Sequence, residues 1–390
     1  MKIAVITVGY NRKKPLERLI KSLLNAKYDS DNVDLIISLD FSNDQADMIS
    51  MANNVDWPHG EKLIISHKKN IGLRKHILSC GDLTDKYDAV VIFEDDIIAS
   101  EAYYLYLKSA LNFYKDEKRL AGISLYSPFV NEMAQRPFMP MPTKYDAFFI
   151  KSAQSWGQCW TREMWSGFKE WYIKNSDIPL QESSDMPSRV YSWPESSWKK
   201  YFMKYIVETN KYFLYPYVSL STNASEVGQH NKTLSSTFQV PLQTSKEEFL
   251  LPSFSDGIRY DGFFEREGLY WNLNDKNQSI CVDLYGNKTT TLNFDLLLTT
   301  KKLDLSILQS YSLSHRPHEA NFIYKEFGDQ IFLYDLEGLT DLDIGTRHSL
   351  LDDAKYYSFI PWHTSLLHGV DGLFLYTKRK LFNTISKYKG

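Results

Sequence analysis

Residues 89–100 of the chain read AVVIFEDDIIAS. The apolar run at 89–93 has the composition of a buried strand, and three acids follow it directly: Glu94, Asp95 and Asp96. Neighbouring carboxylates at the end of a buried strand repel one another and lose hydration, so their charge must be compensated. Mg²⁺ or Mn²⁺ would do this, because these ions prefer carboxylate oxygen and leave positions open for phosphates. The alternative is a set of solvated acids that cap the next helix.

Short apolar segments and amphipathic helical patterns alternate around this stretch. Further strands are predicted at Ile3–Val8, Val33–Leu39, Lys62–Ser66 and Leu120–Ser124, and helices at Pro15–Leu24 and Glu101–Tyr114. Nearly continuous apolar strands separated by helices favour an α/β fold, with a mostly parallel central sheet that helices cover on both faces. In such sheets ligands bind beyond the carboxyl ends of the strands, so the residues that follow each strand are the functional candidates.

The pattern changes after about residue 126. Helices are predicted at Thr161–Asn175 and Ser196–Asn210, and the polar stretch Ser219–Ser255 is expected to be a long loop or a boundary. Strand signals at Ser279–Asp283, Thr289–Leu298 and Gln330–Tyr334 predict a smaller mixed region at the C-terminal end.

Composition and charge exclude several classes of protein. The 390 residues carry 45 Lys and Arg against 48 Asp and Glu, a balance that argues against a nucleic-acid-binding surface. Three distant cysteines indicate neither a disulfide framework nor a zinc site. We see no apolar run long enough for a membrane span and no secretory signal, and therefore expect a soluble, cytoplasmic protein. The basic tail from Tyr376 is expected to be a solvated helix, with peripheral contact to the inner face of the membrane as the alternative.

The strand that ends in Glu94-Asp95-Asp96, within an N-terminal βα unit, resembles the DxD-type motif of the GT-A-fold nucleotide-sugar glycosyltransferases. The likeness is greatest to the inverting N-acetylglucosaminyltransferase I family and covers about the first 235 residues. It implies a GT-A, Rossmann-like fold and a metal-dependent, inverting transfer from a UDP-sugar to a glycan hydroxyl. It also implies that Asp96 ligates Mn²⁺ or Mg²⁺, while Glu94 and Asp95 contact the ribose and the donor sugar.

Other segments match the same family. Arg12, in the turn after the first strand, resembles the arginine that meets the nucleotide, and Asp40, after the second, resembles the acid that reads uracil. A carboxylate can accept the N–H of that base. The segment that ends in Arg74 resembles the loop-to-helix element near the donor. His230 lies in a polar segment that resembles the loop closing over the donor, which implies a contact with diphosphate or metal, although a solvated loop histidine is the alternative.

The acceptor half must supply a base, because a sugar hydroxyl is a poor nucleophile until its proton is removed. Glu195, in the stretch SWPESSW at 192–198, matches the family's acidic helix start in position, although paired acids are replaced here by Pro-Glu-Ser-Ser. Burial beside aromatic rings is expected to raise the pKa of Glu195. The alternative is a first-turn acid that suits the helix dipole, and the reserve candidates are Asp185 and Glu182.

Aromatic residues make up 15% of the chain, and six of its nine Trp residues flank this segment. A large aromatic core is one explanation, and a sugar-facing wall is the other. We expect the wall to include Trp156, Trp160, Trp165, Trp171, Trp193 and Trp198. Gly157, between bulky neighbours, indicates a close backbone approach or a positive φ.

The resemblance divides the chain into a GT-A domain (1–240) and an accessory region of unknown role (241–390). The domain comprises a nucleotide-binding half (1–125) and an acceptor half with a lid (126–240). The expected partners are a UDP-sugar and a glycan or lipid-linked glycan, as in bacterial surface polysaccharide synthesis, with a hexosyl or N-acetylhexosaminyl group transferred. One alternative is a sugar nucleotidyltransferase, which needs a Gly-rich phosphate loop where this chain has a single Gly. The other is a catalytically inactive glycan-binding protein of the same fold.

Overall fold

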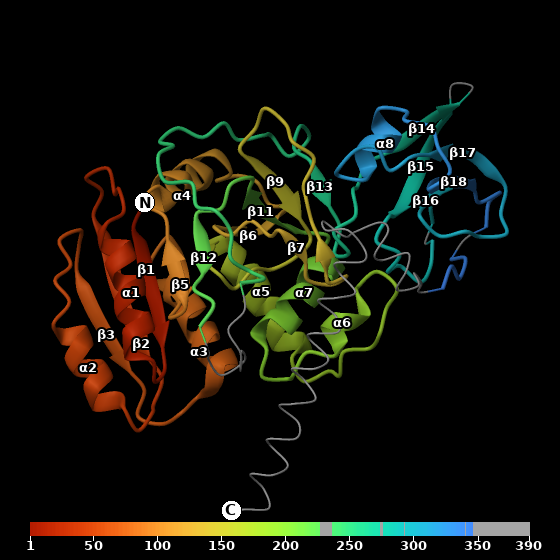
Figure 1. Cartoon of the computed structure of the whole chain (residues 1–390). Helices are drawn as coiled ribbons and strands as arrows, with labels where there is room; N and C mark the ends of the chain where they lie inside the picture. Colours follow the sequence, from red (N-terminus) through yellow and green to blue (C-terminus); the bar gives the residue numbers. More distant parts are fainter. Residues whose placement is uncertain (227–235, 274–275, 292, 340, 346–390) are drawn as a thin grey trace, which may run out of the picture.

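A large mixed sheet organises most of the chain (Figure 1). The computed structural model describes residues 1–226, 236–273, 276–291, 293–339 and 341–345. The sheet has the strand order β13-β9-β11-β6-β10-β4-β1-β2-β3. Its strands are β1 (Ile3–Gly9), β2 (Val33–Leu39), β3 (Lys62–Ser66), β4 (Ala89–Glu94), β6 (Leu120–Ser124), β9 (Ala147–Ile150), β10 (Gln158–Thr161), β11 (Tyr212–Pro216) and β13 (Arg259–Tyr260). β9, β10 and β13 run opposite to the other six strands.

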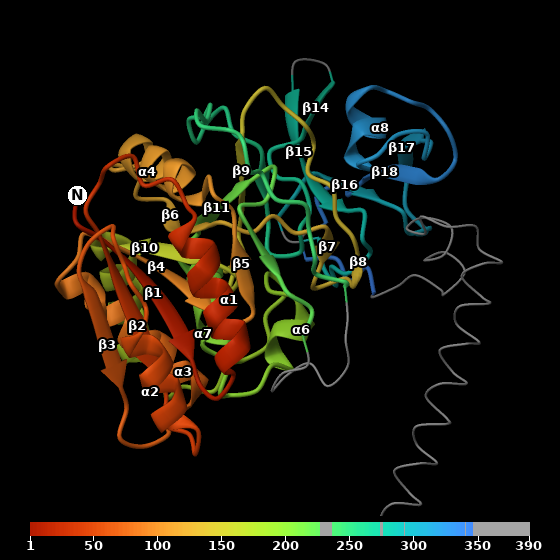
Figure 2. The same cartoon turned by 60° about the vertical axis from the view of Figure 1, so that its left-hand side comes forward.

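Helices cover both faces of this sheet, in agreement with the prediction. They are α1 (Lys13–Leu24), α2 (Gln45–Asn53), α3 (Gly72–Gly81), α4 (Tyr103–Phe113), α5 (Arg162–Asn175), α6 (Ser188–Tyr191) and α7 (Trp198–Glu208). The chain steps from β1 through β2 to β3 in one direction, so the right-handed crossovers place α1 and α2 together on one face. It then returns across β1 to β4, which places α3 on the other face, where it lies beside α7 (Figure 2). On that face α7 also contacts α5.

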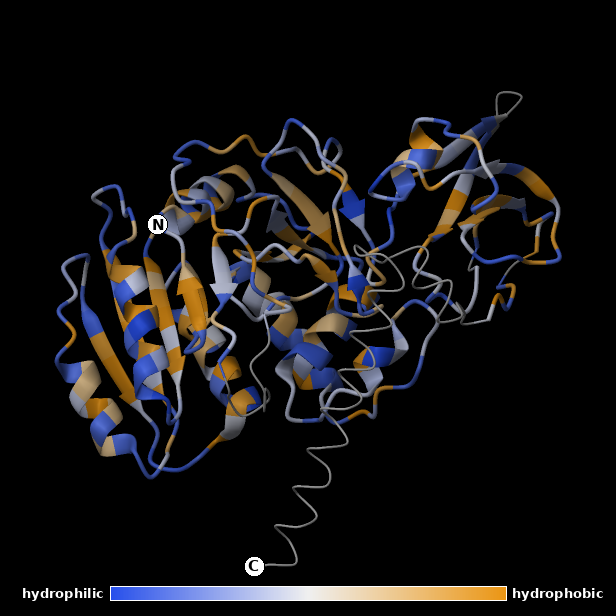
Figure 3. Cartoon of the chain, in the orientation of Figure 1, coloured by the Kyte–Doolittle hydropathy of each residue, from blue (hydrophilic) through white to orange (hydrophobic). Residues whose placement is uncertain are grey.

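The core of the sheet is apolar from strand to strand (Figure 3). Every residue of β1 and β2 is buried, because helices exclude water from both sides of these central strands. β3 lies at the edge and is only partly buried. The predicted α/β fold with a mostly parallel central sheet is therefore confirmed, and the predicted strands 33–39, 62–66 and 120–124 match β2, β3 and β6 to the residue.

The C-terminal region forms a second, smaller sheet with its own core (Figure 1). Its order is β14-β15-β16-β18-β17. The strands are β14 (Tyr270–Leu273), β15 (Lys276–Asp283), β16 (Leu296–Thr299), β17 (Ile307–Tyr311) and β18 (Ile331–Asp335), with the short helix α8 at Glu319–Ile323. The predicted strand at Thr289–Leu298 is wrong in extent, because β16 begins only at Leu296. The smaller mixed region itself is confirmed.

The polar stretch 219–255 contacts the elements around the large sheet, although none of its described residues forms a strand of that sheet. Within it, β12 (Ser221–Asn223) pairs with β5 (Ile97–Ala99), directly after the acidic turn at 95–96. Further along, the hydroxyl of Tyr114 donates to the carbonyl of Pro252 at 2.6 Å, and β13 extends the sheet at its far edge. The predicted boundary at residue 240 stays a prediction.

Several short elements were not predicted, among them β5, β9, β10 and β11. A two-stranded ribbon joins β7 (Val130–Asn131) to β8 (Arg136–Pro137), and a 3₁₀ turn spans Asp82–Asp85.

Among the described residues, no helix has the length and apolarity that crossing a bilayer requires. The basic tail from Tyr376 lies outside the described residues.

Gly157 has both properties expected of it. Its φ is +91°, and a Cβ atom built there would lie 3.1 Å from Phe93 Cε1 and 3.1 Å from Ser221 Oγ. The residue therefore lets the chain turn into β10 beside the end of β4.

Gly157→Ala should lower the free energy of unfolding by about 1–3 kcal/mol, because alanine disfavours this φ and its methyl group meets two neighbours. Gly262→Ala is the matched control: its nearest contact would be Lys151 O at 3.6 Å, and the expected change is within about 0.5 kcal/mol. Urea unfolding measures both. Equal effects of the two substitutions would contradict the assignment of strain to residue 157.

Candidate functional site

A cavity of about 350 Å³ lies at the carboxyl ends of β1, β2 and β4. The chain leaves β1 toward β2 on one side, whereas β4 flanks β1 on the other, so the connections diverge there and leave a crevice. The lining residues come from the segments that follow these strands and from the start of α3. They are Val8, Gly9, Tyr10, Asn11, Arg12, Asp40, Asn70, Gly72, Leu73, His76, Glu94, Asp95, Asp96 and Glu226.

One guanidinium joins the two sides of the crevice. Arg12, at the start of α1, donates to Asp95 through Nε at 3.1 Å and through Nη2, and its Nη2 lies 3.5 Å from Asp96 Oδ2. The pairing of β1 with β4 makes this contact possible, because it sets residues 83 positions apart side by side. The structure therefore brings Arg12 together with Asp95 and Asp96, and its predicted contact with the nucleotide stays a prediction.

The acids of the cavity are compensated in different ways. Burial raises the pKa of Glu94 to about 8, with further increases from Asp96 and Asp95, so this group is largely protonated at neutral pH. Burial also raises the pKa of Asp95, to about 6, against the opposing effect of its hydrogen bond from Arg12. The carboxylate of Glu226, on the segment after β12, accepts from both terminal nitrogens of Arg18, which lowers the pKa of Glu226.

Asp96 differs from the other acids of the cavity. Its Oδ1 is buried and has no hydrogen-bond partner among the described residues, and the Nη1 of Arg12 is likewise unpartnered. A buried carboxylate oxygen without a donor is an unfavourable arrangement that a cation would relieve. Within the described residues no three His, Cys, Asp or Glu side chains converge as a complete metal cage. One carboxylate with open positions for phosphates is nevertheless a donor set that Mg²⁺ or Mn²⁺ accepts.

Asp40 lies in the cavity wall and also organises it. Its carboxylate accepts from the backbone N–H groups of Ile71 at 2.9 Å and Gly72 at 3.0 Å, so it caps the start of α3. The side chain is buried, with 4% of its surface exposed. Oδ1 also accepts from the backbone N–H of Phe41 at 2.8 Å, whereas Oδ2 accepts, among the described residues, only from Gly72 and keeps an acceptor position, so capping and base recognition are compatible at Oδ2.

Arg74 and Glu195 belong to a second cluster, beside the cavity. The Arg74 guanidinium lies over the Tyr201 ring at 5.0 Å, and the Tyr201 hydroxyl donates to Glu195. Lys200 Nζ donates to the other Glu195 oxygen at 2.7 Å. Tyr201 and Arg74 therefore link Glu195 to α3, the helix that contributes Gly72 to the cavity wall, although neither Arg74 nor Glu195 lines the cavity.

The expected environment of Glu195 is wrong. Its side chain is 70% exposed rather than buried, and hydrogen bonds from Lys200 and Tyr201 lower its pKa instead of raising it. It lies in the turn before α7, not inside the helix. Although Trp193 and Trp198 lie close to Glu195 in the sequence, they do not bury its side chain, because the turn that carries Glu195 faces the solvent. Its role as base stays a prediction, now with a carboxylate that is ionised at neutral pH.

The predicted tryptophan wall is wrong for half of its members. Trp160, Trp165 and Trp198 are core residues: Trp160 is fully buried and contacts the other two rings at 4.8 and 5.4 Å. Their positions on β10, α5 and α7 direct them between helix and sheet. Trp156 and Trp193 remain half-buried, and the indole N–H of Trp171 donates to Glu208 at 2.8 Å.

The remaining predicted residues have little structural support. Glu182 and Asp185 are exposed in the segment between α5 and α6. His230 lies outside the described residues, so its predicted contact with diphosphate or metal stays a prediction.

Sequence reasoning missed Arg18 as a cavity-supporting residue and His76 as a wall residue. Burial lowers the pKa of His76 to about 4, so the ring is neutral, and it shares a 2.7 Å hydrogen bond with Ser38. Since His76 follows Gly72 by four residues, the helical repeat could have placed it on the same face. No sequence signal joins Arg18 to Glu226 across 208 positions.

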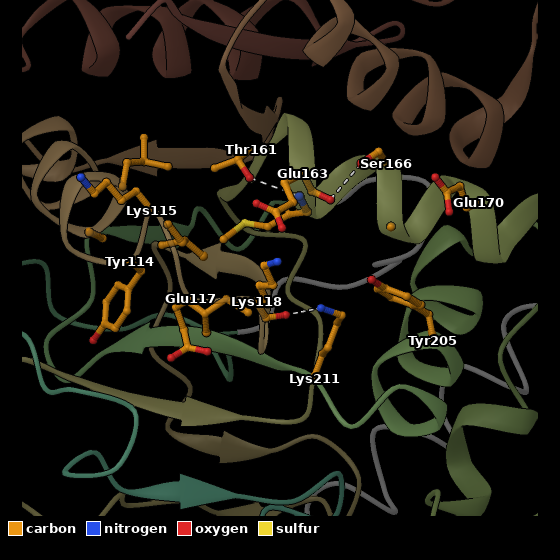
Figure 4. Close-up of a pocket in the computed structure, with 16 residues that line it drawn as sticks. Tyr114, Lys115, Glu117, Lys118, Thr161, Glu163, Ser166, Glu170, Tyr205 and Lys211 are labelled. Atoms are coloured by element: carbon orange, nitrogen blue, oxygen red, sulfur yellow. Dashed lines mark hydrogen bonds between the residues drawn. The ribbon is translucent and has the colours of Figure 1, made fainter.

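A second cavity, of about 250 Å³, lies at the opposite edge of the sheet, near the amino ends of β6 and β11 (Figure 4). The residues that line this cavity carry charges of both signs, and four of the charged side chains are exposed: Lys115, Lys118, Glu163 and Glu170. Solvated charges of mixed sign at the amino ends of the strands do not select a ligand. The first cavity is therefore the candidate site.

No protein-family model matches this chain, and no curated protein does. Among solved structures it is similar to residues 1–349 of S. aureus TarS, with a TM-score of 0.36, 16% identity, and coverage of 58% of this chain and 61% of that chain. For the same fragment in complex with UDP-GlcNAc the TM-score is 0.37 and the identity 14%, with coverage of 60% of this chain and 62% of that chain. For GalNAc-T7 with UDP, GalNAc and Mn²⁺ the TM-score is 0.40 and the identity 12%, with coverage of 55% of this chain and 42% of that chain. This chain thus covers less than two thirds of each, and with TM-scores this low the fold and the site rest on its own contacts.

Arg12→Met should lower the free energy of unfolding by about 1–3 kcal/mol, because it leaves Asp95 buried without its partner. Adding Asp95→Asn should restore at least half of the loss, since the unpaired charge is then removed. Urea unfolding measures both, with Lys13→Met, 51% exposed on the same helix, as the near-neutral control. A double variant no more stable than Arg12→Met would contradict the pairing.

Proposed function

We propose that the chain is a metal-dependent glycosyltransferase of the GT-A type that uses a nucleotide-sugar donor. The observation that supports this most is the cavity at the carboxyl ends of β1 and β4. In this cavity the negative charge of Asp95 is compensated by Arg12 and that of Glu226 by Arg18, while Glu94 is protonated. A buried oxygen of Asp96, in contrast, has no partner among the described residues. That charge balance suits one divalent cation together with a diphosphate.

The predicted site residues that line the cavity have the following roles in this proposal. Asp96 would hold Mn²⁺ or Mg²⁺, which would supply positive charge to the diphosphate leaving group. Arg12 positions the acidic turn and offers its free Nη1 to the nucleotide. Asp40, fixed by its bonds to the start of α3, accepts the uracil N–H of a UDP donor. Glu94 and Asp95 contact the donor sugar and ribose.

The transfer itself requires one base. Glu195 takes the proton of the acceptor hydroxyl as that oxygen attacks the anomeric carbon, and UDP departs from the opposite face with inversion. Its hydrogen bonds from Lys200 and Tyr201 hold the carboxylate in place beside α3. Asp185 and Glu182 are the reserve candidates.

The proposal extends to the partners and the setting. The transferred group is a hexosyl or N-acetylhexosaminyl unit, and the acceptor is a glycan or lipid-linked glycan, as in bacterial surface polysaccharide synthesis. The reaction takes place in the cytoplasm, and contact of the basic tail with the inner face of the membrane is the alternative to a solvated tail. His230 contacts the donor diphosphate, Arg74 supports the donor side of α3, and the C-terminal sheet is an accessory unit.

A thermal-shift screen of UDP- and GDP-sugars, with and without Mn²⁺, tests the donor. We expect a UDP-sugar to raise the melting temperature only when Mn²⁺ is present, because ligands that bind the folded chain stabilise it. Asp96→Asn should abolish that metal dependence and lower donor turnover by at least about 100-fold. Stabilisation without any turnover or transfer would favour the inactive glycan-binding protein, and pyrophosphate release from a nucleoside triphosphate would favour the nucleotidyltransferase.

Glu195→Gln tests the base. We expect the kcat of transfer to fall by about 10²–10⁴-fold while the melting-temperature shift with UDP-sugar and Mn²⁺ is kept, since the amide cannot take a proton. Tyr201→Phe is the control: it removes one hydrogen bond to the same carboxylate and should cost less than tenfold. Near-normal transfer by Glu195→Gln would remove this residue from the proposal.

A further inference from the structure

Glu226 is the acid of the cavity that comes from farthest along the chain. It lies three residues beyond β12, and β12 pairs with β5 directly after the acidic turn. The backbone N–H of Ala224 donates to the carbonyl of Asp96 at 2.8 Å, and the N–H of Ser225 donates to Asn223 Oδ1 at 2.8 Å. These bonds fix the segment that carries Glu226 to the same turn that carries Asp96.

Arg18 is the direct partner of Glu226. It lies on α1, and its two terminal nitrogens donate to the two carboxylate oxygens, Nη2 to Oε2 at 3.2 Å. Fork-to-fork pairing of this kind fixes a carboxylate and partly neutralises it. Glu226 lines the cavity and Arg18 does not, so the acid faces the site and the arginine lies behind it.

The charge of Glu226 is felt by the other cavity groups. Glu226 lines the same cavity as Asp95 and Asp96. Since ionic interactions in a partly buried cavity are only partly screened, a change of one charge at Glu226 alters the potential at Asp96 as well.

We propose that Glu226 is a further cation-attracting carboxylate of the donor cavity and that Arg18, behind it, sets how strongly the cavity attracts a divalent cation. This inference rests on the proposed function. A purely structural ion pair would not affect cation binding, whereas here Glu226 strengthens the binding of a cation and Arg18 weakens it. Removal of Glu226 removes attraction, whereas removal of Arg18 exposes the full charge of Glu226 to the cavity.

Titration of the full chain with Mn²⁺ alone, followed by the electron paramagnetic resonance of free Mn²⁺, tests the proposal without any donor. Glu226→Gln should weaken Mn²⁺ binding by about 3- to 10-fold, and Arg18→Gln should strengthen it by a similar factor. The double variant should match Glu226→Gln, because Arg18 acts through Glu226. Glu17→Gln and Lys21→Gln, exposed positions on the same helix, are the matched controls and should leave the affinity within about twofold.

A charge-swapped variant, Arg18→Glu with Glu226→Arg, keeps an ion pair and turns its positive partner toward the cavity. It should bind Mn²⁺ more weakly than the wild type even though its melting temperature is retained. Wild-type affinity in the swapped variant, or an Arg18→Gln affinity at or below that of the wild type, would overturn the inference and leave a purely structural pair. A wild-type chain that binds no Mn²⁺ would overturn the proposed function together with it.

Discussion

The contact between Arg12 and the acidic turn is the interaction on which the site depends. A strand that ends in three carboxylates would be unfavourable inside a folded chain unless their charge were offset where burial removes water. Arg12 offsets it for Asp95 directly and for Asp96 in part, and protonation offsets it for Glu94. The remaining buried oxygen of Asp96 is what makes the cavity suited to a cation and not merely a closed ion pair.

That contact exists because of the order of the strands. β1 lies between β2 and β4, and the chain leaves β1 on one side and reaches β4 from the other. The carboxyl ends of β1 and β4 therefore carry Arg12 and the acidic turn to the same point, while the connection to α3 brings its first N–H groups to Asp40. The β5–β12 pair then adds Glu226 from a segment more than a hundred residues later.

Residues that directly follow strands were the predictable part of the site. Arg12, Asp40 and the acids at 94–96 follow strands whose apolar runs are plain in the sequence, and the cavity contains them all. Glu195 and the Trp residues were less predictable, because adjacency in sequence does not report burial: Trp198 lies in the core while Glu195, three residues earlier, is exposed. The antiparallel β10, only four residues long, was missed and carries Trp160 inward.

By itself, the sequence determined the α/β class, the positions of the central strands and the acidic turn, because apolar periodicity and strand-end residues are local properties. The tertiary structure alone decided which of these residues meet. It paired Arg18 with Glu226, joined Arg74 to Glu195 through Tyr201, and buried three of the six Trp residues. The physical reason is that charge compensation and burial depend on neighbours in space, and strand order, not spacing along the chain, selects those neighbours.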